Sequence, residues 1–281
     1  MTTTTNTQTL TRTTHARTTP TRASLTLEGR TLSYLDFGGT PDARPLLALH
    51  GHLSEGASFT GLAAELGPEW RVIAPDQRGH GDSDRAPDYT REGYVDDLIA
   101  LLDHLDLGTP VVALGHSGGG INAYYLAARR PDLVSALVNV DAVVDYPDTG
   151  APSALSFVLG FPYSAATREE LLAACGPIAP MIGPSLRQLP DGTWRLPFHP
   201  QDTIDSEKLV HGDHWAAWLG SDCPALLIHA RKSQALPAEQ AEAMAARRPG
   251  TTMVRLDTDH FVQQQDPKGF AEAVRTFLAS L

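Results

Sequence analysis

Cysteine is scarce in this chain of 281 residues, which has only Cys175 and Cys223. Two thiols so far apart form neither a disulfide framework nor a cluster with metal-ligand spacing. The sequence therefore predicts two free, mostly buried thiols in a protein of a reducing compartment, the cytoplasm.

Positive charge and long apolar runs are also lacking. There are 22 Lys and Arg residues against 33 Asp and Glu residues, which gives a formal net charge of -11 at pH 7. Such a surface repels phosphate, so we expect neither a nucleic-acid nor an anionic-membrane partner. No apolar run approaches the length of a membrane span. The expected partner is a small-molecule substrate, and both a monomer and a homodimer remain open.

The first 22 residues contain mostly Thr, with three arginines and no acidic residue. They lack the apolar core of a signal peptide and the periodicity of an amphipathic helix. We predict a disordered tail over residues 1–22.

Beyond the tail, short apolar runs alternate with segments of helical periodicity. The predicted strands are residues 24–28, 31–37, 45–49, 71–74, 111–114, 134–140, 225–229 and 252–256, and the predicted helices are 59–66, 93–107, 121–130, 238–248 and 267–281. This alternation predicts an α/β fold with a mostly parallel central sheet flanked by helices. The core would comprise residues 23–144 and 222–281. Residues 145–221, rich in Pro, Gly and aromatic residues, break the pattern and are predicted to form an inserted, largely helical cap.

The strand that begins at Val111 ends in Gly115-x-Ser117-x-Gly119, and a helical pattern follows. A strand, a sharp turn and a helix in this order are typical of a nucleophile elbow. We therefore predict that Ser117 is a nucleophile at the positive end of a helix dipole.

Four motifs together resemble the α/β-hydrolase superfamily: His50-Gly51-His52, Asp76-x-Arg78-Gly79-x-Gly81-x-Ser83, Gly115-x-Ser117-x-Gly119 and Asp259-His260-Phe261. The resemblance extends from about Ser24 to the C-terminus and implies a member similar to serine esterases and lactonases. It assigns the general base to His260, which also follows the last predicted strand and so reaches the carboxyl edge of the sheet, where sites form in such folds. His229, inside a strand, is predicted to be a core histidine.

The third member of a triad is less obvious, because the loop of residues 230–236, where many members of the superfamily carry the acid, has no carboxylate. Gln234 stands near the expected position. Asp141 ends the strand after the elbow helix, and the order Ser117, Asp141, His260 fits this fold. We predict Asp141 as the acid and rank Asp257 and Asp259 below it.

Acyl transfer also needs donors for the developing oxyanion. We predict the backbone amides of Gly118 and His52 as these donors, with Leu53 as the alternative to His52. The His52 imidazole either lines the pocket or faces solvent. Further substrate contacts are assigned to Leu53, His116, Trp215 and Trp218. His50 and His52 lack the further ligands that a metal site needs, so we predict no metal and no cofactor.

These residues favour a serine hydrolase that cleaves a small-to-medium, largely apolar ester or lactone. Two alternatives stay open. One is a cofactor-free ring-cleaving dioxygenase in which His260 and Asp141 act on a hydroxylated ring. The other is a hydrolase-like receptor that binds its ligand with little or no turnover.

Overall fold

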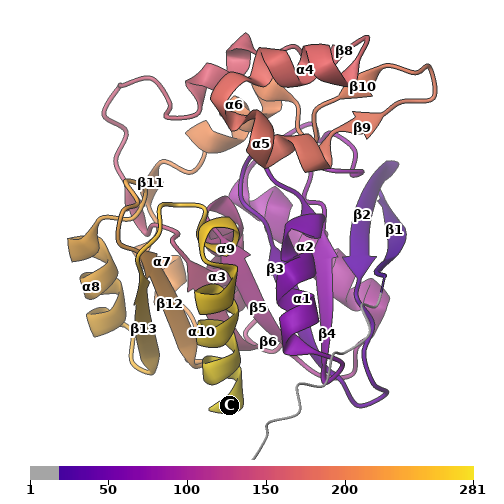
Figure 1. Cartoon of the computed structure of the whole chain (residues 1–281). Helices are drawn as coiled ribbons and strands as arrows, with labels where there is room; N and C mark the ends of the chain where they lie inside the picture. The colour runs from indigo at the N-terminus through magenta and orange to yellow at the C-terminus, as the bar shows by residue number, and fades with distance from the viewer. Residues whose placement is uncertain (1–18) are drawn as a thin grey trace, which may run out of the picture.

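The computed structural model describes residues 19–281 (Figure 1). Most of the predicted tail, residues 1–22, lies outside the described residues. Its last two residues, Thr21 and Arg22, belong to strand β1 (Thr21–Leu27), so the predicted tail is too long. The reason is an ion pair that the sequence pattern did not reveal: the Arg22 guanidinium lies 2.6 Å from the buried carboxylate of Asp76.

One eight-stranded sheet forms the centre of the fold, in the order β1-β2-β4-β3-β5-β6-β12-β13. Its other strands are β2 (Arg30–Asp36), β3 (Arg44–Leu49), β4 (Trp70–Pro75), β5 (Val111–His116), β6 (Val134–Val140), β12 (Ala225–Ala230) and β13 (Thr251–Leu256). In the sheet order from β4 to β13, every neighbouring pair is parallel. Strand β2 is antiparallel to both of its neighbours, β1 and β4. The predicted α/β class with a mostly parallel sheet is confirmed.

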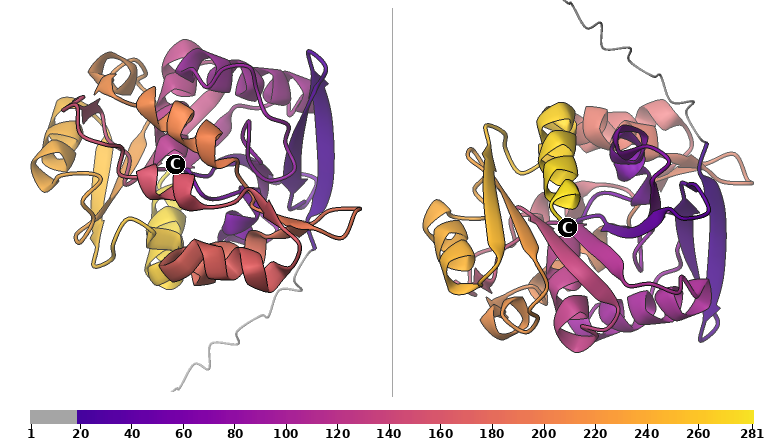
Figure 2. Two further views of the ribbon diagram at one scale, coloured as in Figure 1. Left: turned by 90° about the horizontal axis from the view of Figure 1, so that it is seen from above. Right: turned by 90° about the horizontal axis from the view of Figure 1, so that it is seen from below.

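Helices cover both faces of this sheet (Figure 2). The helices α2 (Arg91–Leu105), α3 (Gly118–Arg129) and α8 (Ala238–Arg247) pack on one face, and α1 (Thr60–Leu66) and α10 (Pro267–Ala279) pack on the other. Strand β3 shows why its apolar run is continuous. Leu47 and Leu49 belong to the first core, whereas Leu46 and Ala48 belong to the second. A strand buried on both faces needs apolar residues at every position.

The segment between β6 and β12 rises over one edge of the sheet (Figure 1). We call residues 147–211 the cap. It contains η2 (Ser156–Gly160), α4 (Arg168–Cys175), η3 (Gly176–Ile178), α5 (Ala179–Ile182), η4 (Gly183–Ser185) and α6 (Pro200–Lys208), with a small sheet of β8 (Ser164–Ala165), β10 (Trp194–Arg195) and β9 (Arg187–Gln188). At its base β7 (Asp145–Tyr146) pairs with β11 (Gly212–Asp213). The cap has an apolar cluster of its own, so it is a packed layer and not a loose loop.

The end of the predicted insertion belongs to the core instead. Helix α7 (Trp215–Trp218) packs against α3. The Trp218 side chain is fully buried, and its indole N–H donates to the Met244 carbonyl of α8 at 3.1 Å. The cap therefore ends before α7, because these aromatic side chains bury better against the sheet layer than above it.

Both cysteines are free thiols, with Cys175 buried and Cys223 partly buried. Within residues 19–281, no helix has both the length and the apolar character needed to cross a bilayer. A short helix, α9 (Val262–Gln265), separates β13 from α10 and follows the loop that carries His260.

Candidate active site

Ser117 lies on a sharp turn between β5 and α3. Its φ of 55° and ψ of -127° are values that a residue with a side chain rarely adopts. The flanking glycines make this turn possible. A Cβ on Gly115 would overlap the carbonyl of Gly119, and a Cβ on Gly119 would overlap the backbone of Leu49. Because α3 begins at Gly118, the positive end of its dipole lies at Ser117.

His260 and Asp141 meet at the same edge of the sheet, although 119 residues separate them. Asp141 follows β6, and its side chain is fully buried. Its Oδ2 accepts a hydrogen bond from His260 Nδ1 at 2.8 Å, and its Oδ1 accepts one from the backbone N–H of Ala230 at 3.0 Å. A carboxylate held from both sides fixes the imidazole with Nδ1 protonated, which leaves Nε2 free to accept a proton.

Asp257 and Asp259 point elsewhere. Asp257 is exposed and lies 2.9 Å from the Lys232 ammonium. Asp259 accepts a hydrogen bond from the Phe261 N–H at 2.9 Å and one from the Gln265 side chain. Of the three carboxylates considered, only Asp141 contacts the imidazole.

Ser117, Asp141 and His260 line one cavity of about 360 Å³ beneath the cap. Most of the remaining wall is apolar and comes from both layers: Ile121, Ala142, Val143, Ala154, Leu155, Val210 and Ala235. Gln234, on the loop that lacks a carboxylate, also lines the cavity. The structure thus brings the three predicted triad residues to one apolar chamber.

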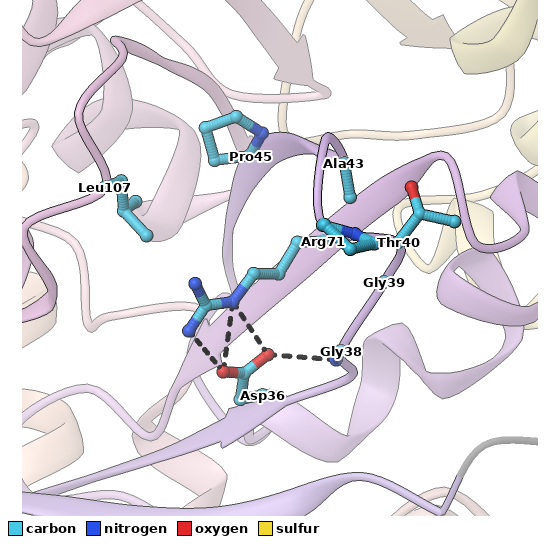
Figure 3. Close-up of a pocket in the computed structure, with 9 residues that line it drawn as sticks. Asp36, Gly38, Gly39, Thr40, Ala43, Pro45, Arg71 and Leu107 are labelled. Carbon is cyan, nitrogen blue, oxygen red and sulfur yellow. Dashed lines mark hydrogen bonds and ion pairs between the residues drawn. The ribbon is translucent and has the colours of Figure 1, made fainter.

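A second hollow, of about 380 Å³, lies at the amino ends of β3 and β4 (Figure 3). Its charged groups satisfy each other, because the Arg71 guanidinium donates to both oxygens of Asp36 at 2.7 to 3.2 Å. Asp36 also accepts from the Gly38 N–H at 2.9 Å. None of the described residues that line this hollow is a serine, cysteine or histidine. Of these two hollows, the cavity beneath the cap is the one that contains both a serine and histidines.

The family profile for the alpha/beta hydrolase fold matches residues 44–267. Lipase LipV of Mycobacterium tuberculosis is 32% identical over 255 residues, which cover 86% of this chain and 95% of the lipase. The pimeloyl-[acyl-carrier protein] methyl ester esterase of Neisseria meningitidis is 29% identical over 250 residues, which cover 85% of this chain and 95% of the esterase. The crystal structure of E-2-(acetamidomethylene)succinate hydrolase has a TM-score of 0.81 at 25% identity and covers 93% of this chain and 100% of its own.

The chain belongs to the α/β-hydrolase family. The relatives named above are hydrolases, and hydrolysis is the reaction class that this membership supports. The resemblance read from the four sequence motifs is confirmed.

In this α/β hydrolase the loop that carries His52 packs closely over the start of α3. A Cβ on Gly118 would lie 3.3 Å from Cε1 of His52, so the imidazole covers this glycine and lines the cavity. His52 Nε2 lies 3.0 Å from the Ser206 hydroxyl of the cap. Of the two orientations left open for His52, the structure has the one that faces the pocket.

Ser206 links the cap to the layer beneath it. Its fully buried hydroxyl lies 3.0 Å from His52 Nε2, 3.2 Å from Arg91 Nη2 and 2.9 Å from the Tyr94 hydroxyl. Arg91 is itself buried and also donates to Asn122 Oδ1 at 2.7 Å. These contacts hold the loop that carries His52 between α2, α3 and α6. No sequence motif marks Ser206, because its contacts with His52, Arg91 and Tyr94 form only when the cap packs over the core.

The four predicted substrate contacts need correction, since none of them lines the cavity. Leu53, with a φ of 64°, is buried in the apolar cluster of the cap. His116 is buried beneath His260, and its Nε2 donates to the His260 carbonyl at 2.7 Å. Trp218 lies in the core, and the Trp215 ring stacks under the Arg247 guanidinium at 3.7 Å. The position of a residue in the sequence, relative to the nucleophile, does not tell whether its side chain faces the cavity or the core.

Tyr146 and Glu207 line the cavity but were not predicted from the sequence. Both come from the cap or its base, whose irregular pattern of short helices and turns has no periodicity that would reveal an inward face. His229 lies in the core as predicted, with Nε2 donating to the Leu236 carbonyl at 3.2 Å.

Several histidines around the site are kept neutral. Burial, together with the neighbouring His80, lowers the pKa of both His50 and His52 well below the ordinary 6.5. Burial also lowers the pKa of His116 to about 3, and the nearby His260 adds to the effect. Burial disfavours the charged form because the imidazolium loses its hydration. His52 therefore contributes a neutral imidazole, not a positive charge, to the cavity.

We expect the protein to lose stability as the pH falls below 6.5, and we expect His116→Asn to reduce this loss. The pKa of His116 is about 3 in the folded protein against 6.5 ordinarily. Between about pH 3 and pH 6.5 the unfolded chain binds a proton at His116 that the folded protein does not bind. The contribution of His116 to the free energy of unfolding is therefore fully present above pH 6.5, and it is lost as the pH falls towards about 3. One such histidine contributes about 1.4 kcal/mol per pH unit to the free energy of unfolding. Urea unfolding at pH 6 and at pH 5 gives the change in the free energy of unfolding per pH unit. Equal slopes for the variant and the parent would contradict a neutral His116.

Proposed function

We propose that this α/β hydrolase is a serine hydrolase acting on a small-to-medium, largely apolar ester or lactone. Ser117 is the nucleophile, His260 the general base and Asp141 the acid that orients His260. The single observation that carries the proposal is the 2.8 Å hydrogen bond between His260 Nδ1 and the buried Asp141, in the same cavity as the strained Ser117.

The reaction begins when Ser117 Oγ attacks the carbonyl carbon and its proton passes to His260 Nε2. Asp141 stabilises the imidazolium that forms. When the tetrahedral intermediate collapses, the alkoxide leaving group takes the proton from His260 and the acyl group remains on Ser117. Water then gives a proton to His260 as its oxygen attacks the acyl carbon, and the second collapse releases the acid and returns the proton to Ser117.

The oxyanion forms at the start of α3. We assign the two donors to the backbone amides of Gly118 and His52, with Leu53 as the alternative to His52. The dipole of α3 favours negative charge at this point. The bond from His52 Nε2 to Ser206 supports a preorganised loop, because the imidazole is held by the cap before substrate arrives.

The cavity supports the choice of substrate class. A volume of about 360 Å³ is at the small end of ligand pockets, and its wall is mostly aliphatic. The lipase and the methyl ester esterase among the relatives support an ester as the bond cleaved.

A panel of p-nitrophenyl esters from acetate to decanoate, together with simple lactones, tests this function while an electrode records oxygen. We expect steady ester turnover without oxygen uptake, fastest for short or medium acyl chains. Oxygen uptake with hydroxylated aromatic rings, and no ester turnover, would point to the ring-cleaving dioxygenase. A single stoichiometric burst without turnover would point to a ligand receptor.

A further inference from the structure

Glu207 is an unusual member of an otherwise apolar wall. It lies on α6 of the cap and lines the cavity, and its side chain is only 6% exposed. The other carboxylate of the cavity, Asp141, has hydrogen bonds at both oxygens. No lysine or arginine is among the described residues that line this cavity. Glu207 is therefore the one acidic side chain of the wall that the proposed reaction does not use.

The contacts of Glu207 satisfy one of its two oxygens. Oε1 accepts a hydrogen bond from the Tyr146 hydroxyl at 3.3 Å and lies 3.5 Å from His211 Nε2. Oε2 is buried and has no hydrogen-bond donor among residues 19–281. Burying a carboxylate oxygen without a donor is unfavourable, so folded proteins contain few such atoms.

A purely structural role of Glu207 explains the contacts of its Oε1 but not the buried Oε2 without a donor. Tyr146 stacks on the His211 ring with centroids 4.3 Å apart, and Glu207 joins this pair at the base of the cap. The buried Arg91 makes its hydrogen bonds to Asn122, the Tyr89 carbonyl and Ser206, and none to Glu207. Glu207 lines the chamber in which the proposed substrate would lie, and its Oε2 lacks a donor among residues 19–281.

Resting on the proposed serine-hydrolase function, we infer that Glu207 binds a protonated amine of the substrate, at a distance from the scissile bond. A carboxylate acceptor in an apolar wall selects a group that brings both an N–H donor and a positive charge. An anionic end group would meet Glu207 and Asp141 without any cationic side chain of the wall to balance them. The net charge of -11 attracts the same class of substrate from solution. The substrate class is thus an ester with an aliphatic body and an ammonium group.

Two esters of equal shape test this inference. The p-nitrophenyl ester of 6-(dimethylamino)hexanoic acid carries a protonated amine at pH 7.5, and the ester of 7-methyloctanoic acid has a carbon in its place. We expect the parent protein to show the higher kcat/KM on the ammonium ester. In Glu207→Gln the ratio of the two kcat/KM values should fall about tenfold to a hundredfold, since a hydrogen bond to a charged group is lost.

Asp205→Asn is the matched control. It removes the same charge from α6, but Asp205 is half exposed and does not line the cavity. We expect the ratio in this variant to stay within about twofold of the parent, as for an exposed charge screened by solvent. A parent protein that prefers the neutral ester, or a ratio that Glu207→Gln leaves unchanged, would overturn the inference. A ratio that falls equally in both variants would also overturn it, because general charge would then explain the preference.

Binding of hexylammonium and of 1-hexanol, measured by calorimetry on the full chain, separates this inference from the proposed function. We expect hexylammonium to bind the parent about tenfold more tightly than 1-hexanol and to lose this advantage in Glu207→Gln. If neither ester is hydrolysed, the proposed function fails, whereas the binding comparison still tests Glu207. Equal affinities of the parent for the two ligands would contradict the role of Glu207 even if Glu207→Gln did not fold.

Discussion

Ser117→Ala is expected to lower ester turnover by about 10⁶-fold, the loss that follows removal of the nucleophile of a catalytic triad. The elbow geometry is the reason. Ser117 is held at a φ of 55° between β5 and α3, and the turn aims its side chain into the cavity that His260 also lines. Alanine fits this turn as well as serine does, so the variant should fold and lose only the hydroxyl. Initial rates on the best ester of the panel measure the loss.

A fluorophosphonate probe provides an independent readout, because it reacts with an activated serine and not with an ordinary one. We expect one labelled peptide, containing Ser117, in the parent protein and none in Ser117→Ala. Ser233→Ala is the control, since Ser233 lies on the loop after β12, outside the cavity lining, and its hydroxyl accepts from the Ala235 N–H. Turnover that survives in Ser117→Ala would move the chemistry to His260 alone, as expected for the dioxygenase alternative.

The sheet and its two helical layers could be predicted from the sequence because local patterns determine them. Strands buried on both faces need continuous apolar runs, as in β3 and β12, and such runs are visible without a structure. The convergence of Asp141 and His260 also follows from a simple rule. Parallel strands end at the same edge of the sheet, so residues that follow β6 and β13 come close together.

The cap could not be predicted in the same way. Its short helices and turns pack by tertiary contacts, and no repeat in the sequence tells which residues face inward. Trp218 was expected near the substrate but is buried in the core, whereas Glu207 faces the cavity. For Leu53 and His116 too, the sequence does not tell whether the side chain faces the cavity. Each adjoins a residue that lines the cavity, yet Leu53 packs in the apolar cluster of the cap and His116 is buried against His260.

Asp141→Asn is expected to leave the fold intact and to lower kcat by about 10⁴-fold, the effect of the same change in a serine protease. The carboxylate of Asp141 accepts from His260 Nδ1 and from the Ala230 N–H, and it balances the imidazolium during attack. Asparagine can keep one of these contacts, but it carries no charge and favours the wrong tautomer of His260. Stopped-flow or initial-rate measurements on a p-nitrophenyl ester give the loss in kcat, and thermal unfolding verifies the fold.

Asp257→Asn and Asp259→Asn are the controls for this assignment, because both residues flank the same loop without touching the imidazole. We expect rates close to those of the parent for each. Gln234→Glu in the Asp141→Asn background should restore part of the activity, since Gln234 and His260 line the same cavity and the change returns a carboxylate to the position that many superfamily members use. Near-normal rates in Asp141→Asn, together with inactive Asp259→Asn, would show that Asp141 only terminates β6. A partial rescue by Gln234→Glu would instead show that the site requires a negative charge beside His260 and accepts it from either of two neighbouring strands.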